Sequence, residues 1–137
     1  MAISLDPYLS FDGDAREAMQ FYEDVFGGTL SLATFGDYGA EESPDKIMHG
    51  HLAAARGFTF MGADTPPGAP YQLAGNAAMS LSGDDRGELR GLWDRLSDGG
   101  TVSVPLEKQM WGDEFGMCTD RFGVTWMVNI SAPEQQA

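Results

Sequence analysis

Cysteine is almost absent from this sequence of 137 residues. The single residue, Cys118, excludes an internal disulfide, which is typical of proteins in a reducing compartment. Long apolar runs are missing too, since no stretch approaches the roughly 18 residues of a membrane-spanning helix. The N-terminus also lacks a basic start followed by an apolar segment. We therefore expect a cytoplasmic protein.

Basic residues are scarce as well. Eight lysines and arginines stand against 21 aspartates and glutamates, which gives a formal net charge of −13. A nucleic-acid backbone is bound through clustered basic side chains, and an anionic membrane surface attracts the same groups. Neither nucleic acid nor a membrane is therefore expected as a partner.

The motifs of several enzyme classes are also missing. The sequence contains no G-x-S-x-G elbow, no P-loop, and no glycine-rich turn between a strand and a helix. Nucleotide-derived cofactors normally bind over such a glycine-rich turn. The sequence therefore argues against a methyl-donor site, and with it against methyltransferase activity.

What the sequence does contain is a repeat of half its length. Three short motifs occur once in each half: S-x-x-G-D at 10–14 and 80–84, G-G-T at 27–29 and 99–101, and a strand-like segment at 56–61 and 122–127. A helix-like run separates the first two motifs in both halves. The repeat predicts two equivalent β-α-β-β-β modules in one α+β domain, with a pocket where the modules meet.

Alternation of apolar and polar residues, together with glycine and proline signals, gives the expected elements. Strands are predicted over 3–11, 29–35, 47–54, 58–63, 76–82, 101–104, 115–119 and 124–130. One helix begins after Asp14 and the other after Asp84 or Asp85, and each ends at a Gly-Gly pair, the first of them in a left-handed cap. Residues 1–137 are predicted to form one domain, with modules over 3–63 and 76–131. A proline-rich linker (64–75), a loop (105–112) and a frayed tail (132–137) complete the expected organisation.

The order and spacing of these motifs resemble the vicinal oxygen chelate superfamily, which contains glyoxalase I, extradiol dioxygenases and bleomycin resistance proteins. Within it the chain looks like the PhnB-like branch. The resemblance is carried by residues 7–11 (PYLSF), 17–28, 46–49 (KIMH), 99–100, 105–108 (PLEK), 111–112, 115–116 and 120–129 (DRFGVTWMVN). It implies two tandem β-α-β-β-β modules that form a curved mixed sheet around a cavity. It also implies a homodimer, with modules paired within or across subunits.

Enzymes of this superfamily bind one divalent metal through His, Gln or Glu side chains on the first and last strand of each module. Carried over to this sequence, the last-strand positions are Met61 and Met127, and the first-strand positions are Asn76 and either Asp6 or Tyr8. Thioethers and an amide do not make a site of hard oxygen or imidazole ligands. We therefore expect no metal and no other cofactor.

Two histidines remain as metal candidates. His49 and His51 lie two residues apart on a predicted strand, so they share a face of the sheet. The more ordinary interpretation is that they are plain sheet histidines, because no carboxylate is placed to complete a site. The sequence leaves open whether their face looks into the cavity.

The expected ligand pocket combines positions from both modules: Tyr8, His49, His51, Met61, Asn76, Trp111, Met127 and Asn129. Trp111 could cover the pocket and Asp113 or Glu114 could act as a base. The alternative for this loop is packing against the sheet end or a dimer interface. No catalytic residue is assigned, and Cys118 is expected to be a buried, inert thiol.

Three functions follow from these residues. The first is binding of a small molecule without metal, in the manner of the bleomycin resistance proteins. The second is a metal-dependent lyase, isomerase or dioxygenase that uses His49 or His51. The third is an interaction module whose acidic surface meets a basic protein.

Overall fold

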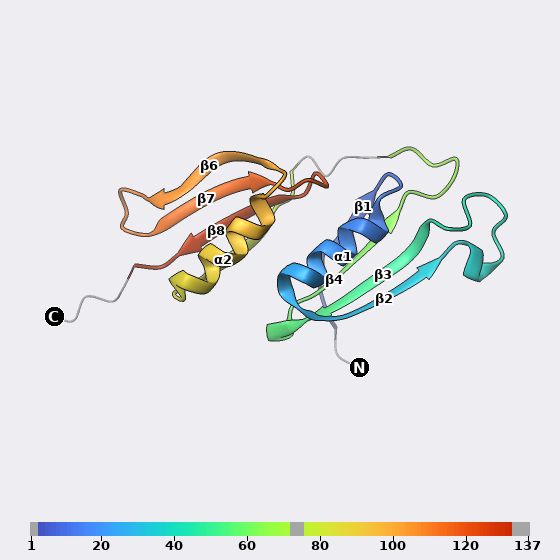
Figure 1. The fold of residues 1–137 in the computed structure, drawn as a ribbon, viewed down its shortest axis with the longest axis horizontal. Helices are drawn as coiled ribbons and strands as arrows, with labels where there is room; N and C mark the ends of the chain where they lie inside the picture. The colour runs from blue at the N-terminus through green and yellow to red at the C-terminus, as the bar shows by residue number, and fades with distance from the viewer. Residues whose placement is uncertain (1–2, 72–75, 133–137) are drawn as a thin grey trace. The chain divides into compact units, whose positions relative to one another are not determined.

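The computed structural model describes residues 3–71 and 76–132. The chain divides into two compact units, residues 1–73 (unit 1) and 74–137 (unit 2), and each is described by itself (Figure 1). Part of the predicted linker (72–75) and most of the predicted tail (133–137) lie outside the described residues. Each unit has the β-α-β-β-β order, which confirms the predicted α+β fold class. Among the described residues, no helix has the length and apolar character needed to cross a membrane.

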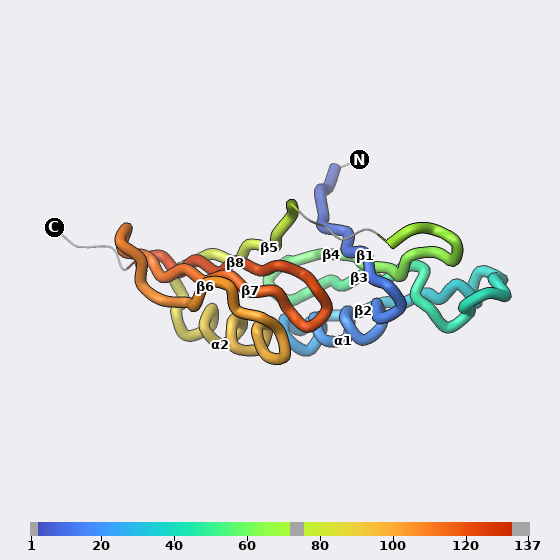
Figure 2. The backbone as a smooth tube through the Cα atoms, turned by 90° about the horizontal axis from the view of Figure 1, so that it is seen from above, coloured from blue at the N-terminus to red at the C-terminus, as the bar shows by residue number. Residues whose placement is uncertain are grey.

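Unit 1 is a four-stranded sheet with one α-helix on one face (Figure 2). Its elements are β1 (Tyr8–Phe11), α1 (Ala15–Phe26), β2 (Gly28–Thr34), the 3-10 turn η1 (Gly36–Tyr38), β3 (Ile47–Ala54), the 3-10 turn η2 (Ala55–Gly57) and β4 (Thr59–Asp64). The strand order is β1-β4-β3-β2, with β1 parallel to β4 and the other pairs antiparallel. The predicted strand over 3–11 is thus ordered as strand only in its second half.

Helix α1 is amphipathic, and its apolar side is fully buried against the sheet. The buried residues are Ala15, Ala18, Met19, Tyr22, Val25 and Phe26. Tyr22 and Phe26 pack edge-on against Phe60 of β4, at ring-centroid distances of 5.5 and 6.0 Å. Gly62 lets Met19 approach the strands closely, because a Cβ at this position would lie 2.9 Å from the sulfur of Met19. These contacts define the helix-covered face of the sheet.

The start of α1 is held differently from the prediction. Asp14 occupies the N-cap position, but its side chain makes no capping hydrogen bond. Instead, Oδ1 of Asp64, at the far end of β4, accepts hydrogen bonds from the backbone N–H groups of Gly13 (2.8 Å) and Ala15 (3.0 Å). A carboxylate from the neighbouring strand therefore takes over the capping role. Gly27 ends the helix with φ 74° as predicted, but its ψ of 179° places it outside the left-handed helical region.

Unit 2 repeats this arrangement. Its elements are β5 (Met79–Gly83), α2 (Arg86–Ser97), β6 (Thr101–Lys108), β7 (Glu114–Thr119) and β8 (Thr125–Ile130), in the sheet order β5-β8-β7-β6. Asp85 caps α2, since its Oδ1 accepts a hydrogen bond from the N–H of Glu88 at 3.1 Å, as one of the two predicted alternatives. Leu89, Leu92, Trp93 and Leu96 form the buried side of the helix.

The loop predicted over 105–112 is wrong in its first half. Strand β6 continues through Pro105 to Lys108. Proline is compatible with this position because β6 is an edge strand, where a missing N–H costs no ladder hydrogen bond. The register with β7 shifts twice, between Val102 and Val104 and between Val104 and Glu107. Such irregularities hide the simple alternation from which strands are predicted.

Candidate ligand pocket on the first unit

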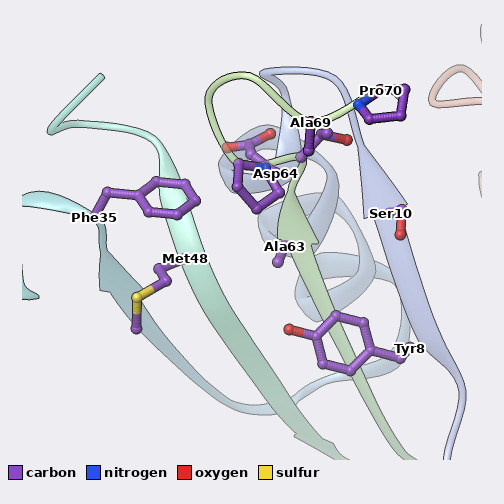
Figure 3. Close-up of a pocket in the computed structure, with 10 residues that line it drawn as sticks. Tyr8, Ser10, Phe35, Met48, Ala63, Asp64, Ala69 and Pro70 are labelled. Carbon is purple, nitrogen blue, oxygen red and sulfur yellow. The ribbon is translucent and has the colours of Figure 1, made fainter. Parts of the chain in front are cut away.

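A β-bulge in β3 shapes the face of the unit 1 sheet opposite α1, called here the open face. Ala33 of β2 pairs with His49, whereas the next residue, Thr34, pairs with Ile47, so β3 contains one extra residue at Met48. Ile47 is completely buried, and Met48 is only partly covered. The side chain of Met48 lies on the face of the sheet opposite α1, as Figure 3 shows.

A pocket of about 320 Å³ lies on this open face, at the end of the sheet where β1 and β4 finish. The phenyl ring of Phe35 and the phenol ring of Tyr8 project into it from opposite sides, and Ala63 lies between them on β4 (Figure 3). Ala63 pairs with Ser10 of β1, and its small side chain leaves the space between the two rings open. The lining residues are Tyr8, Ser10, Phe35, Met48, Ala63, Asp64, Thr65, Pro66, Ala69 and Pro70.

Phe35 is fixed at the base of the loop that follows β2. Its N–H donates to the carbonyl of Lys46 at 3.0 Å, and its own carbonyl accepts from the N–H groups of Tyr38 and Ala40, both at 3.1 Å. The opposite wall is formed by residues 64–70, whose first turn is closed by hydrogen bonds from Thr65 to the carbonyl of Phe11. Backbone hydrogen bonds therefore fix both walls, the first within the loop that follows β2 and the second to the end of β1.

Asp64 joins three elements below the pocket. Besides accepting from Gly13 and Ala15, it accepts from the N–H of Ile47 through Oδ2 at 2.9 Å, and the residue is only 4% exposed. One carboxylate thus satisfies backbone donors of the β1–α1 turn, of α1 and of β3. These contacts make Asp64 a structural anchor of the pocket rather than a free acid.

The structure brings the four predicted site residues of unit 1 onto one face. Tyr8 and His51 both pair with Met61, so the three side chains share a row across β1, β4 and β3. His49 lies two residues from His51 on the same side. The Tyr8 hydroxyl lies 3.4 Å from Nδ1 of His49, and the two ring centroids are 5.9 Å apart. Both histidines therefore point away from α1, although of these four residues only Tyr8 lines the pocket.

The four predicted site residues of unit 2 are less closely associated. Asn76 lies in an exposed turn before β5, and the strand register places Ser80 rather than Asn76 opposite Met127. Asn129 donates a hydrogen bond to Oδ2 of Asp113 at 3.1 Å. The Trp111 side chain is 61% exposed and contacts Phe115 at a centroid distance of 6.3 Å.

These residues do not fit the divalent metal of the superfamily. Between the first and last strand of each unit, the paired residues are Tyr8 with Met61 and Ser80 with Met127, and these supply thioethers and hydroxyls instead of His or Glu. Within residues 3–71 and 76–132, no three His, Cys, Asp or Glu side chains are grouped so that they could hold a metal ion.

The two candidate bases, Asp113 and Glu114, both accept hydrogen bonds from other protein groups. Hydrogen bonds from Arg90 and Arg86, at 2.6 and 2.8 Å, hold the pKa of Glu114 below its usual range. Hydrogen bonds from the N–H of Ala132 and from Asn129 lower the pKa of Asp113. A depressed pKa makes a carboxylate a weaker base near neutral pH. The structure therefore argues against this role for either residue.

Cys118 is buried, as expected of an inert thiol. Its side chain lies within β7, and burial, with a smaller contribution from Asp120, raises its pKa to about 11. The thiolate required for reactivity is thus disfavoured at neutral pH.

Several pocket residues were not anticipated from the sequence. The prolines of residues 64–70 predict part of a linker, whereas these residues form one wall of the pocket. Phe35 and Met48 flank an irregular loop and a bulge, neither of which has a periodic signal. The one signal in the sequence is that an apolar aromatic residue, Phe35, directly precedes an otherwise polar loop.

Comparison with known proteins decides the family. The model of the glyoxalase/bleomycin resistance protein/dioxygenase superfamily matches residues 4–128. The chain belongs to this superfamily. The curated protein YjdN of Escherichia coli is 29% identical over 92% of this chain and 94% of its own length. An uncharacterized protein of Mycobacterium tuberculosis, Rv0887c, is 33% identical over 92% of this chain and 75% of its own length.

Solved structures agree with this assignment. Protein PA1353 of Pseudomonas aeruginosa is 40% identical, with a TM-score of 0.87 over 96% of this chain and all of that chain. A second structure is that of a PhnB protein from Bacillus cereus, described as a putative 3-demethylubiquinone-9 3-methyltransferase. Its TM-score is 0.78, and the match covers 94% of the present chain and all of the Bacillus chain. At 21% identity, the second likeness shows the fold alone.

Proposed function

We propose that this superfamily member binds a small organic molecule in the pocket of unit 1, and that it does so without a metal. The observation that carries the proposal is the pocket itself, about 320 Å³ in volume and formed by aromatic, thioether and hydroxyl side chains. Ligand sites are typically concave, largely apolar and equipped with a few polar groups, with volumes from about 300 Å³ upward. The proposed ligand is therefore small.

Replacement of two alanines by leucine, one in the pocket and one outside it, tests this function. Ala63→Leu fills the space between Tyr8 and Phe35, whereas Ala53→Leu adds the same atoms at an exposed position of β3 outside the pocket lining. A fragment library is screened by protein-observed NMR against the unmodified protein and both variants. The proposal expects ligands that shift the resonances of Tyr8, Phe35 and Ala63, and that are lost in Ala63→Leu but retained in Ala53→Leu. Fragments that bind Ala63→Leu unchanged would contradict it.

A metal-dependent lyase, isomerase or dioxygenase is the second candidate. One observation favours it, namely that His49 and His51 share the open face with Tyr8 and Met61. It predicts tight, stoichiometric uptake of Zn²⁺, Ni²⁺, Co²⁺ or Mn²⁺ that is abolished by the double substitution of both histidines with alanine. Equilibrium dialysis followed by elemental analysis separates the candidates, because the first one requires no uptake at this face.

Assembly as a homodimer is proposed together with this function. The support is the superfamily membership, in which paired modules are commonly completed across subunits. Light scattering on a sizing column should then give twice the chain mass of 14.8 kDa. A mass of one chain at micromolar concentration would contradict the dimer without affecting the pocket.

A further inference from the structure

We infer that the pocket of unit 1 takes an organic ammonium ion, and this inference rests on the proposed small-molecule binding. The first observation is the arrangement of rings. Phe35, directly after β2, and Tyr8 of β1 project into one space from opposite sides, and the soft thioether of Met48 lies beside Phe35 (Figure 3). Aromatic faces attract cations through their quadrupole, and cages of such rings recognise alkylammonium groups.

The second observation is the chemistry of the remaining lining. Ser10, Thr65 and Tyr8 contribute hydroxyl groups, whereas the carboxylate of Asp64 is already occupied by the three backbone N–H groups that it anchors. Among the ten lining residues that the structure describes, none is a lysine or an arginine. The hydroxyl of Thr65 already donates to the carbonyl of Phe11 at 3.1 Å, so its oxygen lone pairs remain to accept a hydrogen bond. The described lining thus offers acceptors and aromatic faces, which suit a donor with positive charge.

The third observation is the charge of the loop that follows the pocket residue Phe35. Phe35 is followed directly by residues 36–45, called here the acidic loop, which contain Asp37, Glu41, Glu42 and Asp45. All four acidic side chains belong to exposed residues. Carboxylates gathered near a site raise the local concentration of cations and repel anions, more strongly at low ionic strength. The acidic loop therefore favours the same class of ligand as the rings do.

Three probes of nearly the same shape test the inference. Choline carries a quaternary ammonium and a hydroxyl, 3,3-dimethylbutan-1-ol is its uncharged counterpart, and 3,3-dimethylbutanoate is a related anion. We expect choline to bind at least about fivefold more tightly than the neutral alcohol, as estimated for a partly desolvated cation against one or two aromatic faces. We expect the anion to cause no shift of pocket resonances. NMR titration, with Tyr8, Phe35 and Ala63 as reporters, measures all three affinities.

Ring substitutions locate the source of the preference. Phe35→Leu keeps an apolar side chain but removes the aromatic face, so it should bring choline and the neutral alcohol to within about twofold of each other. Tyr8→Leu serves as a second variant at a half-exposed position, in case Phe35→Leu does not fold. The control is Tyr38→Leu, because Tyr38 is an exposed ring of the acidic loop that does not line the pocket. It should leave the preference unchanged.

Each outcome decides a different statement. Preference for choline that is lost in Phe35→Leu and retained in Tyr38→Leu supports the inference. Equal binding of choline and the neutral alcohol at the pocket overturns the preference for cations while leaving small-molecule binding intact. Absence of any pocket shift with choline also overturns the inference, and the fragment screen with Ala63→Leu then decides the proposed function independently.

Discussion

The phenolic oxygen of Tyr8 lies 3.4 Å from Nδ1 of His49, across the strand that separates β1 from β3. This distance is long for a hydrogen bond of a hydroxyl, so the contact is expected to be weak. Tyr8→Phe removes the hydroxyl and keeps the ring. We expect the ring resonances of His49 to shift more than those of His51 in a ¹H–¹⁵N spectrum. Stability should change by less than about 0.5 kcal/mol, because Tyr8 is half exposed. Equal shifts of both histidines would contradict this pairing.

Asp64 should be the most sensitive carboxylate of unit 1. Its side chain accepts hydrogen bonds from the N–H groups of Gly13, Ala15 and Ile47, and the residue is buried. Asp64→Ala leaves these donors without their acceptor, and we expect a loss of about 2–4 kcal/mol in the free energy of unfolding. Asp12→Ala, at an exposed position of the same β1–α1 connection, should change it by less than about 0.5 kcal/mol.

Urea denaturation, followed by circular dichroism, measures both Asp64 and Asp12 variants. Resonances of α1 residues report whether the loss is confined to unit 1. Equal stability of Asp64→Ala and Asp12→Ala would show that the carboxylate is not an anchor.

The second glycine of each Gly-Gly pair is required by a close approach of backbone. A Cβ on Gly28 would lie 2.1 Å from the carbonyl oxygen of Ala53, and one on Gly100 would lie 2.2 Å from that of Thr119. Gly100→Ala should therefore destabilise the protein by about 1–3 kcal/mol. Gly91→Ala is the matched control, because this helical position has open space around it and alanine is the better helix former. It should stabilise by about 0.5–1 kcal/mol, and thermal unfolding of both variants checks the opposite signs.

Features set by local sequence could be predicted, whereas features set by contacts between strands could not. The helix of each module and the position of all eight strands follow periodicity, so their prediction succeeded, although the strands predicted over 3–11 and 101–104 differ in length from β1 and β6. The predicted caps are wrong in detail, because α2 ends at Ser97 with an extended Asp98 before its Gly-Gly pair. The bulge at Met48 and the broken register of β6 could not be found, since each depends on the partner strand rather than on local sequence.

The site was predictable only in part, for a similar reason. Tyr8, His49, His51 and Met61 share a face because strand alternation is a local property. The pocket itself depends on Ala63 being small between Tyr8 of β1 and Phe35 of the loop after β2, which are far apart in the sequence. Capping of α1 by Asp64 instead of Asp14 is likewise a contact between segments far apart in the chain.

Glu114 should make the stability of unit 2 depend on pH in the acidic range. Its pKa is lowered by hydrogen bonds from Arg90 and Arg86. The folded state therefore binds this proton less readily than the unfolded chain, whose glutamates titrate near about 4.3. The stability contributed by Glu114 is present above that pH and is lost as the pH falls through the lower folded value.

Substitution of Glu114 by glutamine removes this titration. Urea denaturation at pH 7 and at about pH 3 should show a smaller loss of stability on acidification for Glu114→Gln than for the unmodified protein. Glu41→Gln, in the exposed acidic loop, supplies the control for a change in net charge alone. Parallel pH profiles for Glu114→Gln and the unmodified protein would refute a role for the Arg86–Glu114–Arg90 contacts.

Cys118 should make stability fall as the pH rises, whereas Glu114 makes it fall as the pH decreases. Burial raises its pKa to about 11, whereas a thiol in an unfolded chain titrates near about 8.5. Above that lower value the unfolded state releases the proton first, so stability is lost as the pH rises toward 11. At pH 8 the thiol of the folded protein should react with a disulfide reagent such as 5,5′-dithiobis(2-nitrobenzoate) only as fast as the chain opens. Labelling in 6 M urea should be immediate, while rapid stoichiometric labelling of the native protein would contradict both the burial and the raised pKa.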